Sequence, residues 1–191
     1  MLKRLTIALA SLALLTGCKP AAPTPPPPAS QARTDTLTFF VSGLECAACT
    51  ESVRQSIYGL DGIQKVLMKE GLEGYATVSF TTETVSAQQI AQAVHDAPPL
   101  HGTPYEASLR LKVPAYAQAD QAAKINTLLA NQKSAITAEP DWDAKDQLII
   151  RFLPLENQAP VPPRTARGWN PSQLTEALRK TSLTSTWISA E

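Results

Sequence analysis

This chain contains an internal repeat, which limits the folds that it can adopt. Apolar positions of the first half recur in the second half at one constant offset. The matching pairs are Leu37 with Leu109, Phe39 with Leu111, Val53 with Ile125, and Val78 with Ile150. A repeat of this length indicates one supersecondary unit that is used twice. The sequence therefore predicts two copies of one small α+β unit in tandem.

The first copy alternates between the two regular hydrophobic periods. Runs in which every second residue is apolar predict strands, and apolar residues three or four apart predict helices. The expected order is a strand at 37–41, a helix from Ala47 that Gly59 ends, strands at 63–68 and 75–80, a helix that Ser86 caps and Pro98 closes, and a strand at 105–111. This order is βαββαβ.

Two cysteines, Cys46 and Cys49, lie where the first strand gives way to the first helix. A spacing of three residues at such a junction turns both sulfurs toward one point, and the start of a helix favours the thiolate form. Soft thiolates select Cu(I) and related ions that accept two ligands, whereas zinc usually takes four. The same spacing is also typical of a thiol redox couple or a structural disulfide, and these alternatives stay open.

The stretch from Leu37 to about Leu109 resembles the heavy-metal-associated domain of copper chaperones, copper-transporting ATPases and periplasmic mercury-binding proteins. The segment that carries the resemblance, VSGLECAAC, is similar to the Gly-Met-x-Cys-x-x-Cys loop of the family. The resemblance implies a ferredoxin-like βαββαβ sandwich with Cys46 and Cys49 as metal ligands. It also implies that Leu44 replaces a methionine under the loop, a nearly isosteric change, and that Tyr105 packs near the site.

The N-terminus has the pattern of a bacterial lipoprotein. Residues 1–17 combine a basic start with an apolar stretch too short to span a bilayer, which is typical of a signal peptide. The segment that ends at Cys18 resembles a lipobox, which implies that this cysteine is acylated. Residues 18–34 are rich in proline and predict an extended tether. We therefore expect a lipid-anchored protein of the cell envelope that faces the periplasm, on the outer membrane if the organism has one.

We expect residues 35–108 to form the metal-binding domain and residues 109–191 to form a degenerate copy. The positions that correspond to the two cysteines are Gln118 and Gln121, so the second copy lacks thiols. The segment from Tyr105 to Val113 is the last strand of one unit and the first strand of the other, with no linker between them.

Several other residues invite functional interpretations, and for each we expect a structural role. The three tryptophans could mark an interaction surface, but core or half-buried packing is the expected role. The aspartates near residue 143 suggest calcium only superficially and predict a solvated hairpin turn. The two histidines could complete a zinc or Cu(II) site, but solvent-facing positions are expected. These residues are Trp142, Trp169, Trp187, Asp141, Asp143, Asp146, His95 and His101.

The charge balance excludes nucleic acid as a partner, because the 17 basic and 17 acidic residues leave no excess of positive charge to bind phosphates. The expected function is non-enzymatic binding and transfer of Cu(I), with Hg(II) or another thiophilic ion as the alternative cargo. An envelope metal transporter or a cuproprotein is the expected partner. Two other classes remain: a membrane-tethered thiol–disulfide exchange protein and a structural or interaction lipoprotein.

Overall fold

The computed structural model describes residues 32–71, 74–155 and 165–190. The chain divides into two units, Met1–Gln31 and Ala32–Glu191, and the described residues all belong to the second. The expected signal peptide and the lipid-attachment residue Cys18 lie outside the described residues. Among the helices of the described part, none has both the length and the apolar character that a membrane span requires.

The described residues form two successive βαββαβ units that share a strand, which confirms the predicted fold class. The first unit consists of β1 (Thr34–Ser42), α1 (Ala47–Tyr58), β2 (Ile63–Lys69), β3 (Tyr75–Thr81), α2 (Ala87–His95) and β4 (Glu106–Lys112). The chain continues through a short 3-10 helix, η1 (Pro114–Ala117), α3 (Ala119–Ala130), β5 (Ile136–Pro140), β6 (Gln147–Phe152), α4 (Pro171–Lys180) and β7 (Thr186–Trp187).

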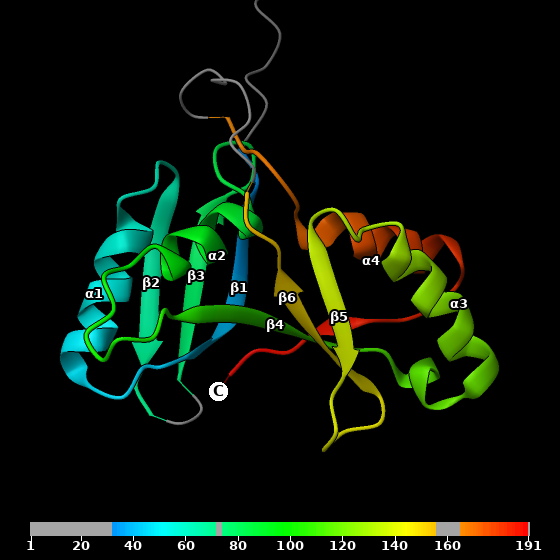
Figure 1. Ribbon diagram of the computed structural model, residues 1–191. Helices are drawn as coiled ribbons and strands as arrows, with labels where there is room; N and C mark the ends of the chain where they lie inside the picture. The colour runs from blue at the N-terminus through cyan, green and yellow to red at the C-terminus, as the bar shows by residue number, and fades with distance from the viewer. Residues whose placement is uncertain (1–31, 72–73, 156–164, 191) are drawn as a thin grey trace, which may run out of the picture. The chain divides into compact units, whose positions relative to one another are not determined.

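The strands join into one seven-stranded antiparallel sheet in the order β2-β3-β1-β4-β6-β5, with β7 paired to β4. Strand β4 pairs with β1 through Glu106–Ser108 and with β6 through Ser108–Lys112. Figure 1 shows β4 running between the strands of the two repeats. Because β4 belongs to both units, one sheet runs through the two units without a break in its hydrogen bonding.

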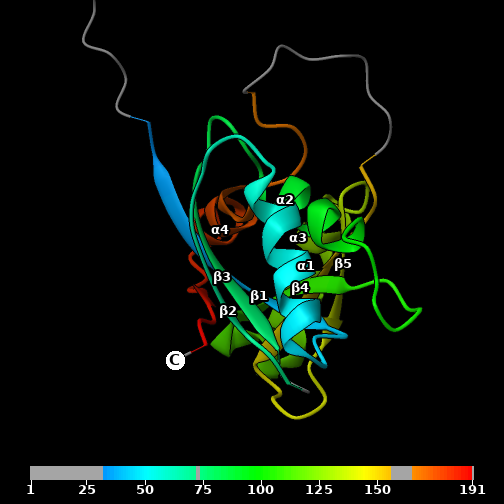
Figure 2. The ribbon, with the colours of Figure 1, turned by 90° about the vertical axis from the view of Figure 1, so that its left-hand side faces the viewer.

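One continuous hydrophobic core lies on one face of this sheet. Residues paired across antiparallel strands point to the same face, so the pair Val41–Ala107 places β1 in phase with β4. The side chains of Phe39 and Val41 and those of Leu109 and Leu111 therefore share the buried face. In the first repeat, α1 covers this face of β1 to β3 (Figure 2), and buried residues of both repeats belong to a single cluster.

The starts of α2 and α4 follow the local signals of the sequence. Ser86 forms the predicted capping box with Gln89 at the start of α2. The sequence pattern of Asn170 followed by Pro171 predicts a cap with proline at the first helical position, and Asn170 is the N-cap residue of α4 with Pro171 in its first turn. The side chain of Asn170 makes no hydrogen bond to its own helix. Its Oδ1 instead accepts the backbone N–H of Ala87, at 2.8 Å, in the first turn of α2.

Two of the three tryptophans have the expected structural role and the third does not. Trp169 is 2% exposed, and Trp187 packs edge-on against it with ring centroids 6.3 Å apart. Trp142 is 88% exposed, in the turn between β5 and β6, so its predicted core packing is wrong. Asp141 orders this turn, because its Oδ1 accepts the N–H of Asp143 at 3.1 Å. This agrees with the predicted hairpin turn.

Candidate metal centre

The loop between β1 and α1 depends on a glycine at its first bend. Gly43 has φ +86°, a conformation that L side chains rarely adopt. A Cβ at this position would lie 3.2 Å from the ring of Tyr105, so the ring packs directly against the loop backbone. The N–H of Glu45 donates to the carbonyl of Gly43 at 2.9 Å and closes the bend. Glycine is therefore required here both by the backbone and by the close approach of the tyrosine.

The two cysteines lie at the start of α1, as the sequence predicts. Cys46 is the N-cap residue, and its Sγ accepts the N–H of Cys49 at 3.1 Å. The two Cα atoms are 5.1 Å apart, and the sulfurs are joined in a disulfide. Cys49 is fully buried while Cys46 is only partly buried. The pair therefore has one sulfur set into the core and one that solvent reaches.

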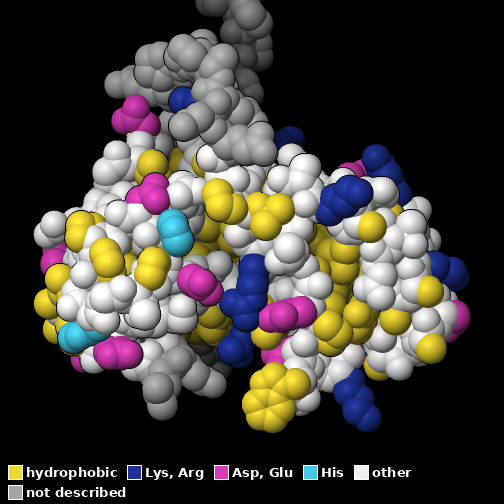
Figure 3. Space-filling model, viewed as in Figure 1, with side chains coloured by type: hydrophobic (Ala, Val, Ile, Leu, Met, Phe, Trp, Pro, Cys, Tyr) yellow, Lys and Arg dark blue, Asp and Glu magenta, His cyan; other side chains and the backbone are white. Residues whose placement is uncertain are grey.

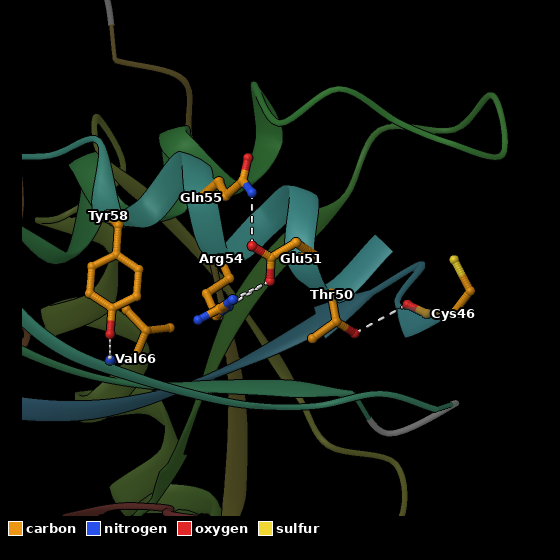
Figure 4. Close-up of polar contacts among 7 residues, drawn as sticks. All are labelled: Cys46, Thr50, Glu51, Arg54, Gln55, Tyr58 and Val66. Atoms are coloured by element: carbon orange, nitrogen blue, oxygen red, sulfur yellow. Dashed lines mark hydrogen bonds and ion pairs between the residues drawn. The ribbon is translucent and has the colours of Figure 1, made fainter. Parts of the chain in front are cut away.

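The first turns of α1 beyond the cysteines form a polar network on the helix surface. The hydroxyl of Thr50 donates to the carbonyl of Cys46 at 3.2 Å, and Glu51 binds both Arg54 and Gln55 (Figure 4). The hydrogen bond from Arg54, and then that from Gln55, hold the pKa of Glu51 below its ordinary value. The N–H groups at the start of α1 would favour a negative charge on the sulfurs once the disulfide is reduced, and the first turn has no acidic residue to oppose that charge.

Leu44 and Tyr105, the two residues expected near the pair, are both buried. Leu44 is 0% exposed, and its carbonyl accepts the N–H of Gly71 at 2.8 Å, which ties the cysteine loop to the turn after β2. Tyr105 is 2% exposed and packs on the loop at Gly43. Both side chains support the backbone that carries the cysteines. A role for either residue in metal binding stays a prediction.

A third candidate ligand, His101, lies beside the cysteine pair. The ligand atoms of Cys46, Cys49 and His101 all lie within 4.8 Å of one another. The sequence predicts a solvent-facing histidine, with metal ligation as the alternative; the side chain is exposed, and it also lies beside the sulfurs. The topology contains the signal: Ser42 at the end of β1 pairs with Glu106 at the start of β4. The loop before β4 must therefore meet the loop after β1.

The other histidine belongs to a different surface. His95 lines a cleft of about 300 Å³ together with Glu106 and Arg151. In the space-filling view the two histidines are well separated, and acidic and basic side chains are interspersed around them (Figure 3). Among the described residues, the cluster with the two cysteines is the one group of three or more His, Cys, Asp and Glu side chains with the spacing of a metal site.

The second repeat has a helix start that corresponds to the cysteine site, but it has no thiols there. Gln118 is the N-cap residue of α3, as Cys46 is of α1, and its side chain makes no cap hydrogen bond. Gln121 lies in the first turn of α3, and its amide binds Asp120 at 2.8 Å. Neither amide offers a soft donor. The candidate site is therefore confined to the first repeat.

Fold and site together define a ferredoxin-like domain that presents paired cysteine sulfurs at the start of its first helix. The sequence profile of the heavy-metal-associated domain matches residues 38–99. The chain is 37% identical to the periplasmic component of the mercuric transport protein of Pseudomonas fluorescens over 67 residues, which are 35% of this chain and 71% of that protein. It is 31% identical to the copper-transporting ATPase HMA4 of Oryza sativa subsp. japonica, over 39% of this chain and 8% of the ATPase.

Among solved structures, oxidized MerP from Ralstonia metallidurans CH34 is similar, with 31% identity and a TM-score of 0.34 over 39% of this chain and 97% of that one. By its sequence the chain belongs to the heavy-metal-associated domain family, which confirms the resemblance.

Proposed function

We propose that the reduced Cys46–Cys49 pair binds one soft metal ion, with Cu(I) as the primary cargo, and passes it on by ligand exchange. The observation that carries the proposal is the joint position of the two cysteines at the start of α1, with Cα atoms 5.1 Å apart and sulfurs in contact. Two sulfurs this close bind a single ion after reduction. The domain thus supplies a two-thiolate site for a metal cargo.

The donor set fits a soft ion and argues against zinc. Thiolates select Cu(I) and Hg(II), which accept two or three ligands, whereas structural zinc sites take four. The names of the relatives point in the same direction, since one is a mercuric and one a copper-transporting protein. Hg(II) is therefore the alternative cargo. The Cu(I) assignment rests on the donor chemistry together with these relatives.

The unequal burial of the two sulfurs supports an order of exchange. Cys46 is partly exposed and Cys49 is fully buried, so an incoming thiolate reaches the ion from the side of Cys46. Of the two metal–sulfur bonds, the one to Cys46 then breaks first, once the incoming sulfur is bound, while Cys49 keeps hold of the ion. No electron is transferred in this step.

The location that suits this activity is the cell envelope. The signal-peptide pattern of residues 1–17 and the lipobox-like segment at Cys18 support export and acylation, and residues 18–34 would serve as the tether. The domain limits 35–108 and 109–191 belong to the same proposal. An envelope metal transporter or a cuproprotein would then deliver or receive the ion on the periplasmic side.

Anaerobic competition with a Cu(I) chelator tests this function. Both thiolates are needed at once, so Cys46→Ser and Cys49→Ser should each cost most of the affinity of the reduced wild type. The matched control is Gln118→Ser. Gln118 is the N-cap residue of α3 in the second repeat, as Cys46 is of α1 in the first. Equal copper affinity in the wild type and the two cysteine variants would contradict the proposal.

The disulfide favours a second candidate function, thiol–disulfide exchange. A redox protein needs one accessible attacking thiol and one resolving thiol, and the partly exposed Cys46 with the buried Cys49 satisfies this requirement. Insulin reduction separates the two functions. Metal transfer predicts little turnover, whereas rapid turnover and trapped mixed disulfides in the Cys49→Ser variant would favour exchange.

A further inference from the structure

We propose that the imidazole of His101 is a third, exchangeable ligand of the ion held by Cys46 and Cys49, which makes the site an S₂N site. This inference rests on the proposed metal-binding function and extends it to a residue outside the cysteine loop. The three ligand atoms already lie within 4.8 Å of one another while the sulfurs are joined in a disulfide.

The distances suit a three-coordinate ion. Metal–sulfur bonds of about 2.3 Å and metal–nitrogen bonds of about 2.0 Å in a plane separate sulfur from nitrogen by roughly 3.7 Å. The observed upper limit of 4.8 Å therefore leaves about 1 Å for closure onto the metal. Imidazole is also a donor that copper accepts readily. Small rearrangements of an exposed loop suffice to complete the site.

Two hydrogen bonds hold the part of the loop just before His101. The carbonyl of Pro98 accepts the hydroxyl of Ser52, at 3.0 Å, from α1, the helix that Cys49 belongs to. The N–H of Leu100 donates to the hydroxyl of Tyr105, beyond the histidine in the chain, at 3.4 Å. These contacts hold the loop next to the helix start that carries the sulfurs.

The histidine itself stays free to leave. Its side chain is exposed, and it is followed by Gly102, whose φ of +83° and open surroundings allow the tip of the loop to bend. A thiolate from a partner can therefore replace the imidazole. In that step the metal–nitrogen bond breaks and a metal–sulfur bond forms, so His101 protects the ion between transfers and gives way during transfer.

X-ray absorption on the anaerobically Cu(I)-loaded protein, residues 19–191, tests the assignment. The wild type should show two sulfur ligands and one nitrogen ligand, and His101→Ala should show sulfur ligands alone. In chelator competition, the variant should bind Cu(I) roughly 10- to 100-fold more weakly than the wild type. The matched control is His95→Ala, because His95 is exposed and belongs to a different surface. It should keep the full coordination set and affinity.

Each outcome decides between the two claims. Loss of the nitrogen ligand in His101→Ala alone supports the S₂N site. Two sulfur ligands in both proteins, with equal affinities, would overturn the role of His101 and leave the two-thiolate site intact. A wild type that shows no copper–sulfur bonds would overturn both. Thermal melts should be unchanged in His101→Ala, since the side chain is exposed.

Discussion

The side chain of Gln88, in the first turn of α2, binds Trp169 of the second repeat: its Oε1 accepts the N–H of Trp169 at 2.9 Å. Its amide donates to the carbonyls of Leu153, at 2.8 Å, and Ala135, at 3.4 Å. Gln88 is only 3% exposed. Gly168, with φ +84°, leaves no room for a Cβ beside this amide. One buried glutamine thus satisfies backbone groups from three segments of the second repeat.

Gln88→Ala should destabilise the whole described unit. The substitution leaves the N–H of Trp169 and the carbonyl of Leu153 without partners, and a buried unpaired polar group costs about 1–3 kcal/mol. The free energy of unfolding in denaturant should fall by about 2–4 kcal/mol. Gln55→Ala, at an exposed position of α1, should change it by less than about 0.5 kcal/mol. Equal effects of the two substitutions would show that the Gln88 contacts do not stabilise the fold.

Removing residues 110–191 should destabilise the first repeat while leaving the cysteine loop in the remaining chain. Strand β4 is shared, and its pairing with β1 covers only Glu106–Ser108. The truncation also removes Phe152, whose ring lies 6.0 Å from that of Phe39. The thermal midpoint should fall by about 10 °C or more relative to residues 32–191. Equal midpoints would mean that the first repeat is stable on its own.

The two reduced cysteines should differ in reactivity. Alkylation requires an accessible thiolate, and Cys46 is partly exposed whereas Cys49 is fully buried. Limited treatment with iodoacetamide, followed by peptide mass spectrometry, should show modification of Cys46 first. Preferential labelling of Cys49 would contradict the proposed order of ligand exchange, because it would make the buried sulfur the one that incoming groups reach.

Cys18→Ala should abolish membrane association and leave the melting curve of the folded unit unchanged. Acyl chains contribute about 0.8 kcal/mol per buried CH₂ to membrane attachment, and the substitution removes their attachment point. Fractionation of cells after a salt wash measures this. A variant that still sediments with membranes would refute the lipoprotein prediction.

The sequence predicted the architecture because the repeat and the hydrophobic periods are local signals. Helix α1 begins at Ala47 as expected, and α3 begins at Ala119, at the same offset as the repeated core positions. The side chain of Asn170 shows what local signals do not predict. A residue before Pro171 is a good cap by local rules, but its side chain binds Ala87 in the other repeat. Contacts between repeats depend on tertiary placement, which periodicity does not contain.

The site was predictable in part for the same reason. The cysteines are close in sequence, so their spacing indicates a common point, whereas His101 reaches them only because β4 returns beside β1. Residues 183–188 alternate in the sequence and predict the last strand, but β7 contains only Thr186–Trp187. It pairs with Leu111 and Lys112 at the end of β4, whereas β1 pairs with Glu106–Ser108 at its start. Because β4 is shared, the last strand of the second repeat has fewer residues to pair with than the sequence pattern suggests.

Native mass spectrometry under anaerobic conditions shows whether Cys46 and Cys49 hold the metal, because it counts the metal ions on each chain. Reduced protein, residues 19–191, mixed with a slight excess of chelated Cu(I), should carry one copper ion per chain, and the Cys46→Ser/Cys49→Ser double variant should carry none. Uptake of copper by the double variant equal to that of the wild type would contradict the account, because it would place the metal away from the start of α1.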